Sequence, residues 1–231
     1  HVVFDLDDTL YVELDYVLSA FEFVGQMVSR LYGVTSAAKE LRRLHSAGDT
    51  APLQSYWLDK ALPADALGDC IAAMRAHCPN IRLREDARAL IATLDSIGIP
   101  WSILTDGRSV TQRQKIIALG LNEASRSIYI SQERGVSKPA LAAFTQIERD
   151  FSEIGRFFYV ADNPAKDFLA PNKLGWMTIM LSDSGSNIHK QDIALLDAGK
   201  AKETIETLLE LLQFLDTDNS TYGHSAIDRA N

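Results

Sequence analysis

Five short apolar runs recur along the chain, and each is followed by a polar loop. Continuous apolar runs of this length are typical of strands that are buried on both faces of a parallel sheet. Most of the segments between them repeat apolar residues at helical spacing, as residues 86–97 do. This alternation predicts an α/β fold with a doubly wound, mostly parallel sheet. The expected strands are residues 2–4, 101–104, 127–130, 157–160 and 177–181.

The helices expected between these strands are bounded by glycine and proline. A helix over 109–119 ends before Gly120, one begins near Pro139 and runs to 149, and one from Pro164 ends before Gly175. Glycine commonly follows the last turn of a helix, and proline is tolerated in the first turn. Residues 200–215 repeat Ile and Leu at helical spacing, which predicts a final helix packed on the core.

The segment 12–79 interrupts this alternation, because it has no strand pattern. Helical patterns cover residues 14–32, 36–46, 52–61 and 64–77, separated by glycine and proline. We therefore expect a small all-helical domain inserted after the first strand. The larger domain then comprises residues 1–11 and 80–215, and residues 216–231 form a polar tail.

Charge and composition narrow the classes of function. The 231 residues include 31 Asp and Glu against 23 Lys and Arg, a net charge of -8. Phosphate backbones and anionic lipids require clustered cations, so we expect neither a nucleic-acid nor a membrane partner. No apolar run approaches the roughly 20 residues of a membrane span. The chain starts in the middle of a strand without a signal peptide, so we expect a longer natural N-terminus and a cytoplasmic location.

Acidic residues gather where the first and fourth expected strands end. Asp5, Asp7 and Asp8 follow the first strand, and Asp162 and Asp167 follow the fourth. In open α/β sheets ligands bind at the carboxyl ends of the strands. Crowded carboxylates are costly unless a cation is present or a proton is shared. Oxygen ligands at two strand ends therefore predict a Mg²⁺ site.

Two further segments favour an anionic ligand at the same edge. After the second strand, Thr105 offers a hydroxyl and Gly107 allows backbone N–H groups to approach an anion closely. Lys138 precedes Pro139, where a helix is expected to begin. The helix dipole disfavours a cation at that position unless an anion lies between them.

Taken together, four motifs resemble those of the haloacid dehalogenase-like (HAD) phosphohydrolases. The order of the motifs and their positions at strand ends are similar to those of the family, over about residues 1–182. One departure is Ala161, which stands where the family usually has glycine. The matching residues are Asp5-Leu6-Asp7-Asp8-Thr9-Leu10 for the first motif, DxDxT[LV], then Thr105, Lys138, and Asp162 with Asp167 for the fourth, GDxxxxD.

This resemblance implies a mechanism with a phosphorylated enzyme. Asp5 is the expected nucleophile, which forms an aspartyl-phosphate. Asp7 is the expected acid that protonates the leaving group and then the base that activates water. Mg²⁺ is expected on the Asp5 carboxylate, the Asp7 backbone carbonyl and Asp162. Asp8 and Thr9 are expected to shape the turn.

The resemblance also implies how the phosphoryl group is held. Thr105 and the N–H groups of Asp106 and Gly107 are expected to bind phosphoryl oxygens. Lys138 is expected to neutralise charge on Asp5 and on the phosphoryl group. Asp167 is expected to orient Lys138 or a metal-bound water.

In this family a helical insertion after the first motif is a C1 cap, which closes over the site and selects the leaving group. A compact helical cap suits a small phosphorylated metabolite, such as a sugar phosphate or a nucleotide. We expect a monomer or a homodimer. Candidate substrate contacts in the cap are its polar residues Asp15, Tyr16, Arg30, His45, Tyr56 and Lys60.

Three other activities are compatible with the fold to different degrees. Dehalogenases of the superfamily lack the second acid of the first motif, which Asp7 provides here, so cleavage of a carbon–halogen bond is disfavoured. A phosphomutase would keep all four motifs and remains an alternative. A catalytically silent binding module is an alternative of another class.

Overall fold

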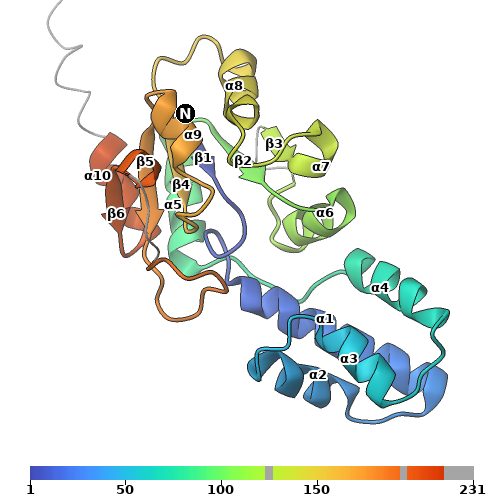
Figure 1. Ribbon diagram of the computed structural model, residues 1–231. Coiled ribbons are helices and arrows are strands. Elements are labelled where there is room, and N and C mark those ends of the chain that lie inside the picture. The colour runs from blue at the N-terminus through green and yellow to red at the C-terminus, as the bar shows by residue number, and fades with distance from the viewer. Residues whose placement is uncertain (123–126, 193–196, 216–231) are drawn as a thin grey trace, which may run out of the picture.

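A parallel six-stranded sheet forms the centre of the larger domain (Figure 1). The structure is a computed structural model, and it describes residues 1–122, 127–192 and 197–215; the expected tail at 216–231 lies outside the described residues. The strands are arranged in the order β3-β2-β1-β4-β5-β6. They are β1 (Val2–Phe4), β2 (Trp101–Thr105), β3 (Ser127–Ile130), β4 (Phe158–Ala161), β5 (Met177–Leu181) and β6 (Glu203–Ile205).

The register of the central strands aligns their carboxyl ends. Phe4 pairs with Ile103 on one side and with Val160 on the other. The Asp5 N–H continues this ladder by donating to the Val160 carbonyl (2.9 Å). The polar residues that follow β1, β2 and β4 therefore emerge at one edge of the sheet, where open α/β folds bind ligands.

Helices cover both faces of the sheet, which confirms the predicted doubly wound arrangement. Successive side chains of a strand point to opposite faces, so Val2 and Phe4 pack with one apolar cluster and Val3 with the other. Helices α5 (Glu85–Ser96) and α6 (Ser109–Ala118) contribute to the first cluster. Helices α8 (Leu141–Asp150) and α9 (Leu169–Lys173) contribute to the second.

Residues 13–76 form an all-helical insert between β1 and α5, as the pattern predicts. It comprises α1 (Glu13–Tyr32), α2 (Ala37–Ser46), α3 (Pro52–Asp59) and α4 (Ala66–Ala76), and it projects from one end of the larger domain (Figure 1). The insert has its own apolar cluster, which includes Val24, Leu41 and Trp57. It also touches the larger domain, where the Thr111 hydroxyl of α6 donates to the Arg75 carbonyl of α4 (3.3 Å).

The prediction of a single helix over 200–215 is wrong. This segment instead adds β6 to the sheet, followed by a 3₁₀ turn (Leu208–Leu211) and α10 (Leu212–Leu215). Ile205 pairs with Leu181 of β5. Thr207 then starts a new helical turn through a reciprocal capping box with Glu210. The apolar residues of this segment have helical spacing, but pairing with β5 and the cap at Thr207 divide the segment into a strand and a short helical part.

Two expected helices begin later than predicted. Helix α8 starts at Leu141, two residues after Pro139, and the peptide bond between Lys138 and Pro139 is cis. Helix α9 starts at Leu169, because residues 163–167 form a turn in which the Asn163 N–H donates to the Asp167 carboxylate (3.1 Å). A short helix, α7 (Ser131–Arg134), was not expected.

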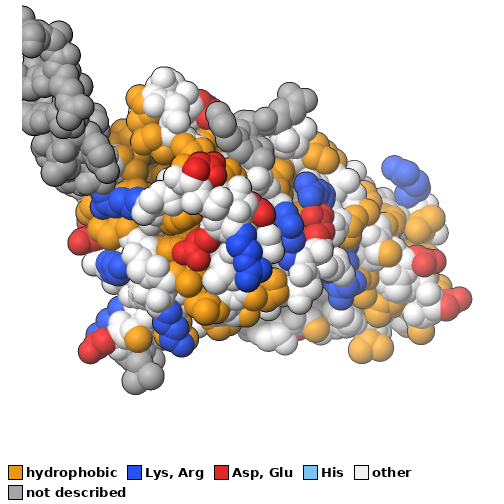
Figure 2. Space-filling view, turned by 90° about the horizontal axis from the view of Figure 1, so that it is seen from above, with side chains coloured by type: hydrophobic (Ala, Val, Ile, Leu, Met, Phe, Trp, Pro, Cys, Tyr) orange, Lys and Arg blue, Asp and Glu red, His pale blue; other side chains and the backbone are white. Residues whose placement is uncertain are grey.

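Charged side chains of both signs are scattered over the face of the molecule seen in Figure 2, among hydrophobic and uncharged ones. Within the described ranges, none of the helices combines the length and the apolar character needed to cross a membrane.

Candidate active site

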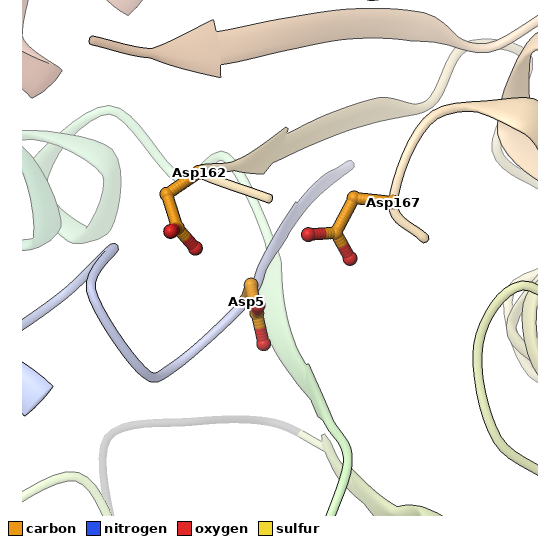
Figure 3. A group of neighbouring side chains, drawn as sticks. All are labelled: Asp5, Asp162 and Asp167. Carbon is orange, nitrogen blue, oxygen red and sulfur yellow. The ribbon is translucent and has the colours of Figure 1, made fainter. Parts of the chain in front are cut away.

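Three carboxylates converge at the carboxyl edge of the sheet (Figure 3). Asp5 follows β1, Asp162 follows β4, and Asp167 lies in the turn before α9. One oxygen from each of the three lies within 4.8 Å of the others, and all three residues are buried. Such a group can hold a metal ion: neighbouring buried carboxylates repel one another, and a cation bound between their oxygens relieves that repulsion.

Lys138 joins two of these carboxylates. Its ammonium nitrogen lies 2.9 Å from Asp5 Oδ1 and 2.7 Å from Asp167 Oδ1, and its side chain is completely buried. The hydroxyl of Tyr159, on β4, accepts a hydrogen bond from Lys138 (2.9 Å) and donates one to Asp167 Oδ1 (3.0 Å). The structure thus brings Asp5, Lys138 and Asp167 together, and adds a tyrosine that the sequence analysis did not identify.

Burial controls the electrostatics of this cluster. It raises the pKa of Asp5, an effect that Lys138 opposes and Asp167 reinforces. Burial, followed by repulsion from Asp5 and Asp167, raises the pKa of Asp162 to about 8. Burial alone would lower the pKa of Lys138, but the Asp167 and Asp5 carboxylates raise it above its ordinary value, so the amine is protonated at neutral pH. Among the described residues, Lys138 is the lysine in direct contact with this cluster, so three carboxyl groups share one adjacent ammonium.

Asp7 has different surroundings. Its Oδ1 accepts hydrogen bonds from the Tyr11 hydroxyl (2.5 Å) and the Lys115 ammonium (2.6 Å), and its Oδ2 accepts one from the Gln112 amide (2.9 Å). Burial would raise the pKa of Asp7, but the charge of Lys115 and these three hydrogen bonds outweigh it and hold the pKa below its ordinary value. Asp7 is thus held as a carboxylate.

The residues expected to bind phosphate lie beside these groups. Gln112 also binds the buried Thr105 hydroxyl (2.6 Å), so it connects Thr105 to Asp7. Asp106 Oδ1 accepts from the backbone N–H of Lys138 (3.2 Å). The Gly107 N–H donates to the Ser131 hydroxyl (2.9 Å), and its φ of 144° lies in a region that favours glycine.

The turn after the first motif fastens a later loop to the site. Asp8 has a positive φ of 52°, and its carboxylate accepts from the backbone N–H groups of Glu13 (2.8 Å) and Ile188 (2.8 Å). In the same loop, the Asn187 amide donates to Asp162 Oδ2 (3.1 Å). The expectation that Asp8 shapes the turn agrees with these bonds, but the contribution of residues 187–188 was not foreseen.

A small cavity of about 210 Å³ opens onto these groups. From the described part of the insert only Glu13 lines it, and none of the polar cap residues proposed from the sequence does. Tyr56 is instead buried in the apolar cluster of the insert, and Tyr16 lies against Lys115. The lining residues are mostly acidic: Asp5, Asp7, Asp8, Glu13, Asp106 and Asp162, with Asn163, Lys166 and His189.

Lys115 and Gln112 could have been found from the helical pattern of 109–119. Spacings of three, four and seven residues place Gln112 and Lys115 on the face that also carries Ile116 and Leu119, both of which are buried. A lysine on a buried helix face requires a partner, because a charge is costly to bury unless it is paired.

Comparison with known proteins agrees with this geometry. The model of the haloacid dehalogenase-like hydrolase family matches residues 1–175. A ribulose-1,5-bisphosphate 5-phosphatase from Halopiger xanaduensis is 26% identical over 235 residues, which cover 91% of this chain and 96% of the relative. A glyceraldehyde 3-phosphate phosphatase from Methanocaldococcus jannaschii is 24% identical over 190 residues, covering 78% of this chain and 83% of the relative.

A similar fold is found among solved structures. The crystal structure of a HAD-hydrolase from Bacillus subtilis bound to magnesium has a TM-score of 0.66, with 17% identity, and covers 93% of this chain and 97% of that chain. Because the family model covers three quarters of the sequence, the chain belongs to the haloacid dehalogenase-like hydrolases.

Proposed function

We propose that the protein is a Mg²⁺-dependent phosphatase that hydrolyses a small phosphorylated metabolite, a sugar phosphate or a nucleotide, through an aspartyl-phosphate. One observation carries this proposal: Asp5 is paired with Lys138, and Asp5, Asp7 and Asp162 line one small cavity. The two curated relatives described above are named as phosphatases of phosphorylated sugars, which favours a sugar phosphate as the substrate.

In the proposed reaction, a carboxylate oxygen of Asp5 attacks phosphorus while the bond from phosphorus to the leaving oxygen breaks. Protonated Asp7 gives its proton to that leaving oxygen. Water then attacks the phosphorus of the aspartyl-phosphate, Asp7 takes the proton of this water, and the bond to Asp5 breaks to release inorganic phosphate. Both carboxyl groups thereby return to their initial states.

The ionised state of Asp7 in the structure is compatible with this role. A phosphate dianion bound in the cavity adds negative charge beside Asp7, and a nearby like charge raises the pKa of a carboxyl group. We infer that Asp7 takes up its proton together with the substrate, and that it is already ionised when it must serve as a base.

The phosphoryl oxygens are proposed to bind at the second and third motifs. The Thr105 hydroxyl and the Asp106 N–H donate to them, and the Gly107 N–H joins after it exchanges Ser131 for a phosphoryl oxygen. The Lys138 ammonium neutralises charge as it develops on Asp5 and on the transferring group. Asp167 and Tyr159 hold this ammonium in place.

The residues present fit a divalent cation. Asp162 is buried beside Asp5, and its side-chain donors in the described ranges are the uncharged Asn187 and Thr9. Asp167 belongs to the same cluster, but its oxygens accept from Lys138, Tyr159 and Asn163. We therefore assign Mg²⁺ to the carboxylates of Asp5 and Asp162 and to the Asp7 backbone carbonyl. When bound, Mg²⁺ screens the repulsion between the Asp5 carboxylate and a phosphate dianion.

We also propose that the insert acts as the cap, with residues 12–79 as one domain and residues 1–11 and 80–215 as the other. The separate apolar cluster of the insert supports this division. In this proposal the insert selects the leaving group, with Glu13 as its contribution to the cavity.

The test is hydrolysis of p-nitrophenyl phosphate by the full chain, with Mg²⁺ and with excess chelator, followed by a screen of phosphorylated sugars and nucleotides. An Asp5→Asn variant purified in parallel controls for contaminating phosphatases. Mg²⁺-dependent release of phosphate is the expected result. Turnover that requires a bisphosphate activator would indicate a phosphomutase. A folded protein that hydrolyses none of these substrates would indicate a binding module, and the proposal would fail.

A further inference from the structure

Lys115 is a buried cation that none of the four motifs contains. It lies in the second half of α6 and is only 3% exposed. An ammonium group is costly to bury unless it is paired and hydrogen-bonded. Its nitrogen lies 2.6 Å from Asp7 Oδ1, in the same site as the reacting groups but on a different element from the other lysine.

The contacts of Lys115 connect the larger domain with the insert. Its ammonium nitrogen lies 4.3 Å from the centre of the Tyr16 ring, which belongs to the first turn of α1, and 5.8 Å from the centre of the Tyr11 ring. A cation at this distance from an aromatic face is attracted by the ring. The ammonium is therefore held between Asp7 and the first helix of the insert.

Together these contacts determine where the Asp7 carboxylate points. Lys115 and Tyr11 bind one oxygen, and Gln112 binds the other. Gln112 and Lys115 come from adjacent turns of one helix, so α6 contacts both carboxylate oxygens. Proton transfer needs the acid within hydrogen-bond reach of the reacting oxygen, and a carboxylate free to rotate would satisfy this only part of the time.

We propose that Lys115 is a positioning residue that holds the Asp7 carboxylate for its two proton transfers, and that Tyr16 of the insert holds Lys115 in turn. This inference rests on the proposed function, in which Asp7 is the acid and the base. The alternative is that the contact only fastens α6 to the turn after β1. The two roles can be told apart by the leaving group. Loss of a positioning role slows proton donation by Asp7 and therefore affects poor leaving groups most, whereas loss of a structural contact affects all substrates equally.

The experiment compares Lys115→Met with the wild type on p-nitrophenyl phosphate and on the best alkyl phosphate from the substrate screen. A poor leaving group needs protonation, whereas nitrophenolate needs little. We expect kcat/KM, which reports the steps up to formation of the aspartyl-phosphate, to fall roughly 10²-fold on the alkyl phosphate and less than about tenfold on the aryl phosphate. Equal losses of kcat/KM on both substrates would overturn the positioning role.

A matched control is Lys202→Met. The Lys202 ammonium donates to the Trp176 carbonyl (2.7 Å) beside the β5–β6 edge, away from the cavity. This variant should keep the wild-type ratio of the two activities. Tyr16→Leu should show the pattern of Lys115→Met at smaller amplitude, and Tyr16→Phe, which keeps the ring, should restore most of the loss.

A second variant guards against misfolding of Lys115→Met, in which Asp7 loses its counter-charge. In an Asp7→Asn background both charges are removed, and Lys115→Met should cause no further loss of the residual activity beyond about twofold, because Lys115 acts through Asp7. Losses that multiply in the double variant would show that Lys115 acts elsewhere and would overturn the inference.

The inference can fail separately from the proposed function. Should the wild type hydrolyse no phosphate monoester, the phosphatase proposal fails, and the crystal structure of Lys115→Met decides the positioning of Asp7. A displaced or rotated Asp7 carboxylate is expected. An Asp7 carboxylate that stays in place between Tyr11 and Gln112 would refute the role of Lys115.

Discussion

Asp5 and Asp7 lie two residues apart, and each binds a buried lysine, but the two pairs are built differently. Lys138 is shared between Asp5 and Asp167 in a fully buried part of the larger domain. Lys115 binds Asp7 where the larger domain meets the insert, and the Asp7 side chain is 20% exposed. The first pair lies wholly within the larger domain, whereas the second involves a residue of the insert through Tyr16.

The two surroundings shift the pKa values of their carboxyl groups in opposite directions. Burial and a surplus of carboxylates raise the pKa values of Asp5 and Asp162. Lys115 and its neighbours lower the pKa of Asp7 despite its burial. One region therefore needs a further cation, and the other is already neutralised. We infer that two aspartates of a single motif acquire different chemistry from the number of donors that the fold supplies to each.

The largest effect should come from Asp5→Asn. An amide cannot attack phosphorus, so we expect kcat on p-nitrophenyl phosphate to fall by at least about 10³-fold. The variant removes one of several crowded carboxylates, so its melting temperature should equal or exceed that of the wild type. Retention of more than a few per cent of the activity would mean that another group is the nucleophile.

The next largest effect is on the free energy of unfolding, for which the two lysines should differ. Lys138→Met leaves Asp5 and Asp167 buried without a counter-charge and should cost about 3–5 kcal/mol of unfolding free energy at pH 8. Lys115→Met leaves one partly exposed carboxylate with two remaining hydrogen-bond donors and should cost about 1–3 kcal/mol. Urea denaturation measures both values. A larger loss for Lys115→Met would contradict the comparison.

The third prediction concerns pH and metal. In the metal-free protein Asp162 keeps its proton up to a pKa of about 8, whereas the unfolded chain loses it near the ordinary value of 3.8. The folded state thus binds more protons in this window, and stability should fall as pH rises from about 4 to about 8. At a hundred times its Kd, Mg²⁺ should add about 2.7 kcal/mol, because it compensates the ionised carboxylates.

Melting temperatures between pH 5 and pH 8, with chelator and with Mg²⁺, test this prediction. The stabilisation by Mg²⁺ should be larger at pH 8 than at pH 5, since protons compete with the metal. Asp162→Asn serves as the matched variant: it should lose most of the Mg²⁺ shift and only part of the pH slope, because the buried Asp5 and Glu13 also have raised pKa values. A metal-free protein that becomes more stable from pH 5 to pH 8 would contradict the assignment.

The smallest effect should come from Gly107→Ala. The positive φ of Gly107 strains any other residue, and an added Cβ would lie 3.2 Å from the Gln112 side chain that binds Asp7. We expect a loss of about 1–2 kcal/mol of stability and a several-fold loss of kcat through Gln112. Gly120 has a positive φ of 71°, against 144° at Gly107, and open space around it, so Gly120→Ala measures the cost of a positive φ without a contact to Gln112.

Several features could be predicted from local sequence because they depend on it directly. The apolar runs are short and end in polar loops, so the first five of the six strands were predicted within one residue at each end. The motif residues follow those strands, and parallel pairing brings them to one edge of the sheet. The family and the fold class follow from this arrangement.

Other features escaped prediction because spacing alone does not determine them. The final apolar repeat fits a helix, but the free edge of β5 pairs with Thr204 and Ile205, and strand pairing outweighs the helical pattern. The helix after Lys138 begins at Leu141, two residues beyond Pro139, where the sequence signal for its start lies. In the insert, none of the polar residues expected to contact substrate lines the cavity, and Tyr56 is buried in the apolar cluster. The packing of the four helices, which the sequence pattern does not specify, determines which residues face the site.

By itself the sequence determined where the candidate residues stand and predicted their chemistry: aspartates after β1 and β4, a threonine at the end of β2, and a lysine before Pro139. Only the tertiary structure decided how each is held. Lys138 and Asp5 are 133 positions apart, and Lys115 and Asp7 are separated by 108. Which buried lysine meets which carboxylate depends on how helices and loops pack across the strand ends. A sequence pattern that extends over a few residues does not specify contacts between residues more than a hundred positions apart.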